Sequence, residues 1–161
     1  MDPILLIEKG IWAGLGALGF GILFNSPPRT LFTLWVGGAI GGLTRALVLQ
    51  YTGSIVLASL AGATAVGIAS IPIAHYRHVP PMIFAIPSVI PLVPGVFAYR
   101  TMLGFIKLTG TIGADYTTTL NETVSYGIKT LFILMSLAVG VAIPMHVMRK
   151  ESVKNIKLRI K

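Results

Sequence analysis

The sequence predicts an all-α, polytopic membrane protein with about five transmembrane helices, the fourth of them broken by prolines. Of its 161 residues, 54% are hydrophobic and only 11% are charged, with a mean hydropathy of +0.82. An average soluble domain carries about 25% charged residues, so this chain has too little charge to coat a water-facing surface. Its uncharged runs are long, and five of its 10 prolines fall in one of them. These observations exclude an ordinary cytoplasmic protein.

The five helices follow from the spacing of the charges. A helix needs roughly 20 apolar residues to cross a bilayer core of about 30 Å. Uncharged runs of about this length cover residues 10–28, 30–44, 46–76, 78–99 and 130–148. We therefore expect one transmembrane domain over residues 1–148, with helices at about 4–24, 28–51, 54–74, 79–108 and 119–148. The first helix is expected to be retained, because the chain lacks the basic opening segment of a secretion signal.

The orientation follows from the basic residues. Six of the 13 Lys and Arg residues lie in the tail at 149–161, which the positive-inside rule places in the cytoplasm. With five spans the N terminus is outside, Arg29 and residues 75–78 are in inner loops, and Asp115 and Glu122 are in the outer loop. We expect a multi-pass protein of the plasma (inner) membrane. The tail is interpreted as a topology anchor that also contacts anionic lipid, the alternative being a docking arm for protein or nucleic acid. Since little basic surface remains elsewhere, we predict no nucleic-acid partner.

The fourth helix is expected to be broken near residues 87–95. Each interior proline removes a backbone donor and clashes with the preceding turn, so Pro87, Pro91 and Pro94 cannot lie in one continuous helix. Broken backbone at membrane depth is tolerated where protein covers it or where it lines a polar cavity. Transporters use such breaks to present helix ends to a substrate. The segment is interpreted as the wall of a substrate cavity, with a kinked packing helix as the alternative.

Small residues recur at four-residue spacing on three of the expected helices. Such stripes let helix backbones approach closely in lipid. They are Ala13, Ala17 and Gly21; Gly37 with Gly41 and Gly38 with Gly42; and Ser59, Ala63 and Gly67. Because this is a large interface for a short chain to satisfy internally, we expect a partner or a homo-oligomer to take part of it.

Two arginines follow uncharged stretches and should lie in the outer half of the membrane. A charge in the bilayer is costly and usually faces a cavity or a partner, and the guanidinium fork suits a carboxylate. For Arg45 both anion binding and helix pairing stay open. Arg100 has the further alternative of snorkelling to the headgroups. Glu8 and Glu122 could neutralise an arginine or carry a proton, or could simply be exposed.

No catalytic constellation is recognisable in the sequence. There is no cysteine, and only five carboxylates are present. Paired carboxylates, phosphate-binding glycine loops and the His-Glu-x-x-His and Gly-x-Ser-x-Gly motifs are missing. We predict no enzymatic activity, no cofactor and no metal. His75, His78 and His146 are interpreted as solvated or headgroup-contacting residues.

Two segments resemble a known family. One is Phe24-Asn25-Ser26-Pro27-Pro28-Arg29 with the glycine-rich helix that ends Gly41-Gly42-Leu43-Thr44-Arg45. The other is Val89-Ile90-Pro91-Leu92-Val93-Pro94-Gly95 with Tyr99. Together they resemble the small subunit of the threonine/serine exporter family, over most of residues 5–148. The positions that match the family pattern are Asn25, Pro27, Arg29, Arg45, Pro91, Pro94, Gly95 and Tyr99, whereas Arg100 is outside it.

The resemblance implies export of small amino acids or dicarboxylates together with a second, larger membrane subunit. In this family a longer protein is built from two halves, and in split systems the second half is a separate small membrane protein. The hypothesis is an exporter subunit whose substrate-binding residues are Arg45, Asn25, Pro91, Pro94, Gly95, Tyr99 and Arg100. Arg45 would attract a substrate carboxylate, and an ion gradient would drive alternating access.

Two other classes of function remain as alternatives. The chain could be a non-transporting homo-oligomeric or accessory scaffold whose glycine faces dock a partner. An intramembrane transferase ranks last, because its only inner-side acid/base candidates are His75 and His78.

Overall fold

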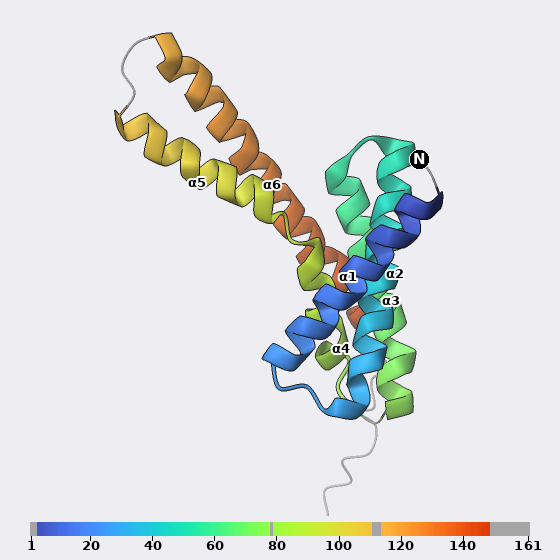
Figure 1. Ribbon diagram of the computed structural model, residues 1–161. Helices are drawn as coiled ribbons and strands as arrows, with labels where there is room; N and C mark the ends of the chain where they lie inside the picture. The colour runs from blue at the N-terminus through green and yellow to red at the C-terminus, as the bar shows by residue number, and fades with distance from the viewer. Residues whose placement is uncertain (1–2, 78, 111–113, 149–161) are drawn as a thin grey trace, which may run out of the picture.

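The computed structural model describes residues 3–77, 79–110 and 114–148, and every regular element in them is helical. The tail at 149–161 and His78 lie outside the described residues. Figure 1 shows the helices in chain order. They are α1 (Pro3–Leu23), η1 (Pro28–Thr30), α2 (Leu31–Thr52), α3 (Ile55–Arg77), α4 (Met82–Val89), η2 (Ile90–Leu92), α5 (Gly95–Gly110) and α6 (Ala114–Val147).

The predicted fold class is confirmed. Four helices of the described chain are long and apolar enough to cross a membrane: Ile4–Leu23, Pro28–Thr52, Ile55–Tyr76 and Asp115–Val147. A fifth span is formed if the bent pair Met82–Leu92 and Gly95–Gly110 counts as one. The chain is therefore a multi-pass membrane protein with one broken helix.

The last helix begins earlier than the sequence predicted. It was expected from about Thr119, with Asp115 and Glu122 in a loop, yet α6 starts at Ala114 and includes both carboxylates. No glycine or proline interrupts the segment from Ala114 to Tyr126, and Asp115 in the first turn complements the positive end of the helix dipole. Together these explain the 34-residue length of α6.

Helices α1 and α2 each end at a residue with positive φ. Asn25 has φ of 54°, its N–H donates to the Ile22 carbonyl, and the Ser26 N–H donates to the Gly21 carbonyl. This is a Schellman motif, in which a left-handed residue satisfies the last carbonyls of the helix. Gly53, with φ of 65°, ends α2 in a related way through a bond to the Leu49 carbonyl. Both turns let the following helix run back along the preceding one.

The small-residue stripes pack against each other within the chain. A side chain at Gly42 would meet Ala13 Cβ at 2.5 Å, and one at Gly38 would meet the Ala13 carbonyl at 2.7 Å, so these glycines set the approach of α1 to α2. Between α3 and α6, a side chain at Gly140 would meet Ala63 Cβ at 2.8 Å, and one at Gly67 would meet Pro144 at 3.2 Å. Contacts inside the chain thus occupy these glycine positions, and a partner or homo-oligomer stays a prediction.

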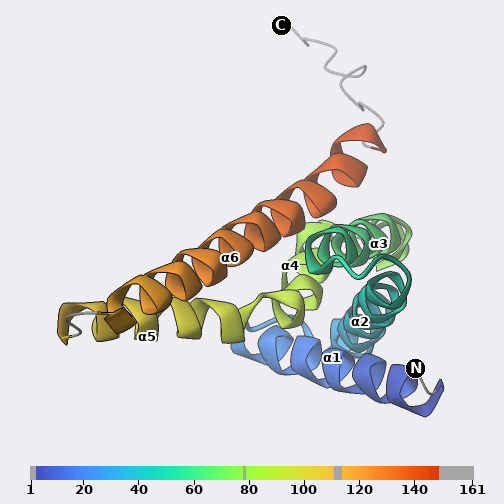
Figure 2. The same ribbon diagram turned by 90° about the horizontal axis from the view of Figure 1, so that it is seen from above.

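The chain divides into a bundle and a hairpin. Helices α1–α4 form the bundle, and α5 with α6 forms a long hairpin that diverges from it (Figure 1). Seen from above, α1, α2 and α3 lie around one side of α4, and α5 and α6 lie on the other (Figure 2). Helix α6 packs on α3 as well as on α5, whereas the extensive contacts of α5 are with α6. The broken segment between α4 and α5 connects the two parts.

One end of the molecule gathers several helix ends. His75 of α3 and His146 of α6 line a cavity together with Pro80, Pro81 and Met82 at the start of α4. Met82 also lines a smaller pocket with Asn25 and Pro27, which precede η1. We refer to this end, defined by His75, His146, Met82 and Asn25, as the histidine end.

Candidate functional site at the helix break

The break comprises residues 90–94 and follows from two prolines. Pro91 lies in the short 3-10 helix η2, Val93 is extended with φ of −60° and ψ of 135°, and α5 begins at Gly95. The segment Met82–Leu92 and the helix Gly95–Gly110 meet at a bend of 56°. Because Pro94 lacks an N–H and Val93 is extended, the helical hydrogen-bond ladder stops here. The carbonyl of Leu92 is left without a helical donor.

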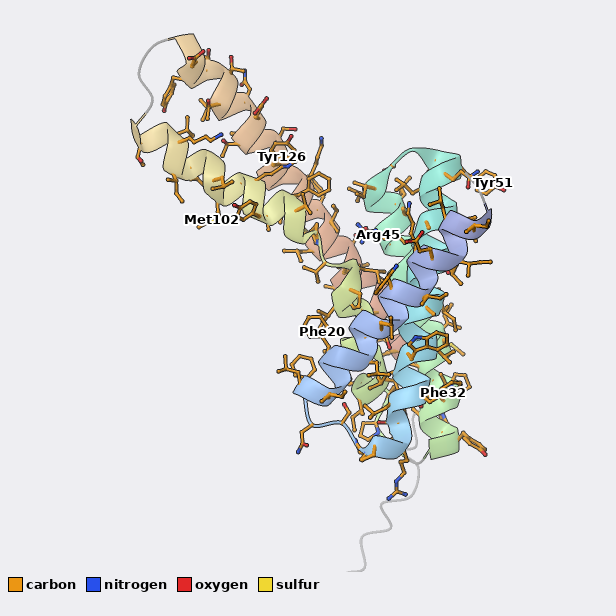
Figure 3. All side chains as sticks on the ribbon, in the orientation of Figure 1. Phe20, Phe32, Arg45, Tyr51, Met102 and Tyr126 are labelled. Atoms are coloured by element: carbon orange, nitrogen blue, oxygen red, sulfur yellow. The ribbon has the colours of Figure 1, made fainter. Side chains whose placement is uncertain are left out.

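The side chain of Arg45 supplies the missing donor. Its Nη1 donates a hydrogen bond of 2.6 Å to the Leu92 carbonyl, across 47 residues of sequence. Figure 3 shows Arg45 on the face of the bundle toward the α5–α6 hairpin. An unsatisfied carbonyl in a bilayer costs several kcal/mol, and an unpartnered arginine there costs at least about 2.5 kcal/mol on insertion scales. The single bond reduces both costs.

Neighbouring helices hold the break in place around Leu92. The Leu92 side chain is 1% exposed and clusters with Ala63, Ile133 and Leu137. A Cβ added at Gly62 would lie 2.8 Å from Leu92 Cδ2 and 3.2 Å from Arg45 Cβ. The absence of a side chain at Gly62 therefore lets α2, α3 and η2 meet at one point. We call Arg45, Gly62 and Leu92 the break node.

The guanidinium keeps capacity for a further partner. Arginine carries five N–H donors, and within the described chain its one hydrogen bond is to Leu92. No described carboxylate lies within ion-pair distance of it. The break node thus presents a cationic fork beside the first turn of α5, whose free N–H groups and dipole also favour an anion. This arrangement suits a carboxylate ligand.

Arg100 lies on the hairpin and contacts α6. Its Nη1 donates to Tyr126 Oη at 3.1 Å, and its guanidinium carbon lies 5.3 Å from the centre of the Tyr126 ring. Phe97 stacks on the same ring with centroids 6.0 Å apart, and Lys129 Nζ lies 5.8 Å from it. Tyr99 is 64% exposed. The structure thus pairs Arg100 with an aromatic residue of the next helix.

Asn25 lies at the histidine end, far along α2 from Arg45. It lines a pocket of about 420 Å³ whose other wall is the first turns of α4, including Met82, Ile83 and Pro87. Arg45 instead contacts the residue that ends η2. The structure therefore does not bring Asn25 to the break, and the Schellman motif accounts for its place in the sequence.

The predicted site residues thus fall into three groups. Arg45 meets the segment that contains Pro91, Pro94 and Gly95; Tyr99 and Arg100 follow on α5; Asn25 is at the other end of α4. The residue that sequence reasoning missed is Leu92, whose backbone oxygen is the partner of Arg45. Its only signal was its place just before Val93, which the following Pro94 restricts to extended backbone. That ends the helical ladder and frees the Leu92 carbonyl without saying what binds it.

The acidic candidates lie on exposed faces. Glu8 Oε1 accepts a hydrogen bond of 3.3 Å from Trp12 Nε1 one turn later in α1, and Glu122 is exposed on α6. Among the residues that the structure describes, no three His, Asp or Glu side chains are grouped to hold a metal ion. The bonded arginine of the break is therefore the most distinctive polar feature of the described chain.

Comparison with known proteins agrees with this architecture. The sequence profile of the family described as "Threonine/Serine exporter, ThrE" matches residues 9–147. An uncharacterized protein of Haemophilus influenzae is 30% identical over 139 residues, which make up 86% of this chain and 46% of the relative. The chain thus spans less than half the length of that relative. No solved structure matches. The break node and the proline-broken span lie inside the matched region, and the chain belongs to the threonine/serine exporter family.

Proposed function

We propose that this chain is one subunit of an exporter for small amino acids such as threonine and serine, or for dicarboxylates, and that it acts with a larger membrane subunit. Membership of the exporter family supports transport. The observation that carries the proposal for this chain is the hydrogen bond from Arg45 to the Leu92 carbonyl at the proline break. It places a cation with unused donors beside a broken helix.

In the proposed mechanism the substrate carboxylate binds the free N–H groups of Arg45. The positive end of α5, which starts three residues after Leu92, adds to the attraction for the anion. Pro91, Pro94 and Gly95 form the wall of this site. Tyr99 and Arg100, on the second turn of α5, continue the path along the hairpin. Asn25 would meet the substrate only near the histidine end.

The break also supplies the moving element of the proposal. Alternating access needs two arrangements of one part of a carrier around a fixed site. Helix α5 is joined to α4 through an extended residue, Val93, between two prolines, while α6 also packs on α3. Rotation at Val93 would reorient α5 while α4 stays packed against α1, α2 and α3. An ion gradient is proposed to drive the cycle.

The larger subunit and the orientation are parts of the same proposal. The relative is more than twice as long as the aligned segment, which supports a working unit larger than this segment. The larger partner subunit is proposed to supply the rest. The N terminus is proposed to lie outside, and the histidine end and the basic tail inside, in the plasma membrane. Arg29 precedes α2 next to the histidine end, in agreement with the positive-inside rule.

The test is efflux from cells that carry single substitutions in the full chain. We expect Arg45→Ala to reduce export of threonine, serine and a four-carbon dicarboxylate at least tenfold, because one carboxylate contact to an arginine is worth about 1.5–3 kcal/mol. Arg45→Lys keeps the charge but loses the fork, so it should restore only part of the rate. Arg29→Ala, at the other end of α2, is the matched control and should export normally.

Abundance in the membrane is measured alongside, so that lost protein is distinguished from lost transport. Normal efflux of all three substrates from Arg45→Ala at normal abundance would refute the role of the break node. Purification in mild detergent tests the subunit proposal. A stable homo-oligomer without a second polypeptide, and inactive in vesicles, would favour the scaffold instead.

A further inference from the structure

A large cavity lies on the face of α4 that looks toward α3 and α6. It has a volume of about 980 Å³ and extends from the histidine end to the break. Its walls are aliphatic, formed for example by Ile86 and Val89 of α4 and by Leu134 and Ala138 of α6. Arg45 is not among its lining residues, so it is distinct from the break node. We call it the α4–α6 groove.

The polar side chains of this groove lie at one end. His75 and His146 line it beside Pro80 and Met82, whereas the lining at the opposite end is Val89, Ile90 and Val93. His75 Nδ1 lies 2.9 Å from the Ile71 carbonyl. That contact assigns the ring hydrogen to Nδ1 and leaves Nε2 for a partner outside the helix. The groove therefore has an apolar body and a polar end.

The depth of the groove corresponds to one leaflet of a bilayer. Helix α4 has eight residues and so rises about 12 Å, and η2 adds about 6 Å. Half of a hydrocarbon core of about 30 Å is about 15 Å. The wall made by α4 and η2 ends where α5 turns away by 56°. A groove that is one leaflet deep fits an acyl chain better than a transmembrane helix, which would continue through the second leaflet.

The charged residues around the groove bear on the headgroup that fits it. Glu8 lies near the start of α1, while Asp115 and Glu122 lie near the start of α6, in each case toward the opposite end of the helix from the residues at the histidine end. No described carboxylate therefore competes for the imidazoles. Arg29 lies in η1 near the same end. With Arg29 near this end and no described carboxylate there, the end is complementary to an anionic group.

We propose that the α4–α6 groove binds an anionic phospholipid, with an acyl chain along α4 and α6 and the phosphate at His75 and His146. The proposal is independent of the substrate and of the export activity. Several groove residues are reachable from outside, since Ile86 is 50% exposed, Leu134 45% and Met82 61%. A lipid can therefore enter sideways from the membrane. Bound there, it would fill the space between α4 and α6 on the far side of the break from Arg45.

The first test is occupancy measured by native mass spectrometry of the full chain in mild detergent. The protein is titrated with phosphatidylglycerol and, separately, with phosphatidylcholine of the same acyl chains. Ala138 is exposed and lines the groove, so Ala138→Trp should fill it and weaken phosphatidylglycerol binding at least tenfold. The matched control is Val139→Trp, because Val139 is 45% exposed and does not line the groove. It should bind as the wild type does.

The second test concerns the headgroup. Wild-type protein should prefer phosphatidylglycerol, and each of His75→Ala and His146→Ala should reduce that preference about fivefold, as expected for the loss of one hydrogen bond to the headgroup. Inorganic phosphate at the same concentration should not displace the lipid. Displacement by phosphate alone would reduce the site to a phosphate contact and overturn the proposal.

Two further results would also overturn it. One is unchanged lipid binding by both Ala138→Trp and Ala142→Trp, the second of which is at another exposed lining position. The other is a cross-link from Ala138→Cys to a second polypeptide, because a protein helix would then occupy the groove. The natural chain has no cysteine, so this label is unique. Loss of export by Arg45→Ala with lipid binding intact would separate the two proposals.

Discussion

The bundle of α1–α4 and the hairpin of α5–α6 differ in how closely their helices pack. In the bundle, α2 buries Gly37, Gly38 and Gly41, which lets neighbouring helix backbones come close. Helix α4 buries four of its eight residues. In the hairpin, Gly104 is the buried residue of α5, and Val96, Met102, Phe105 and Ile106 are more than half exposed. The bundle is packed on itself, while α5 depends on one neighbour. The two parts should therefore differ in their sensitivity to substitution.

The largest effect is expected at Gly38 in the bundle. A side chain there would meet the Ala13 carbonyl at 2.7 Å, and a backbone atom cannot rotate away. Gly38→Leu should destabilise the fold by about 3 kcal/mol, the upper end of the usual cost of overpacking. Equilibrium unfolding in mixed micelles measures this free energy. Gly19→Leu is the control, since a Cβ at Gly19 meets nothing within 4 Å. Equal losses for the two variants would contradict the close approach of α1 to α2.

A smaller effect is expected at Gly104 in the hairpin. A Cβ there would lie 2.8 Å from Thr123 Cβ and 2.9 Å from Thr123 Cγ2, so α5 has to move away from α6. Gly104→Ala should cost about 1–2 kcal/mol of unfolding free energy. Thr123→Ala in the same chain removes Oγ1 and Cγ2 but keeps Cβ, so it should recover part of the loss. If the double variant is as unstable as the sum of the two singles, Thr123 is not the residue that limits the approach.

The smallest effect is expected at Arg100. Its contact with Tyr126 lies on the exposed hairpin, where a cation–π interaction is worth about 0.5–1 kcal/mol. Arg100→Ala should therefore lower the unfolding free energy by about that amount. Tyr126→Phe removes the hydroxyl but keeps the ring, so it should lose less. A loss at Arg100 as large as at Gly38 would mean that the hairpin is packed as firmly as the bundle.

The sequence was sufficient for the parts of the fold that depend on composition and local chemistry. Uncharged runs gave the spans, and Pro91 with Pro94 gave the position of the break. The start of α6 was missed because Asp115 and Glu122 indicated a loop by charge, although both are compatible with a helix. The orientation and the site residues remain predictions.

Contacts between residues far apart in the chain could not be predicted from local sequence. The donor for Leu92 comes from a residue 47 positions earlier, and no local pattern relates the two. A glycine stripe predicts that another helix backbone comes close to it, but not which one. The pairing of α1 with α2 and of α3 with α6 is therefore known only from the structure. The helix-ending role of Asn25 was missed for the same reason, because a polar residue in a turn does not by itself indicate positive φ. Its role as a ligand stays a prediction.

The length of α6 has a mechanical consequence. Its 34 residues extend about 51 Å, well beyond a hydrocarbon core of about 30 Å. The helix must tilt, leave the bilayer, or do both. Since α5 is carried on α6 and reaches the bundle through Val93, any change in that tilt is transmitted to the bend. A change in the thickness of the surrounding membrane would therefore change the tilt of α6 and load the bend at the break, with or without a bound ligand.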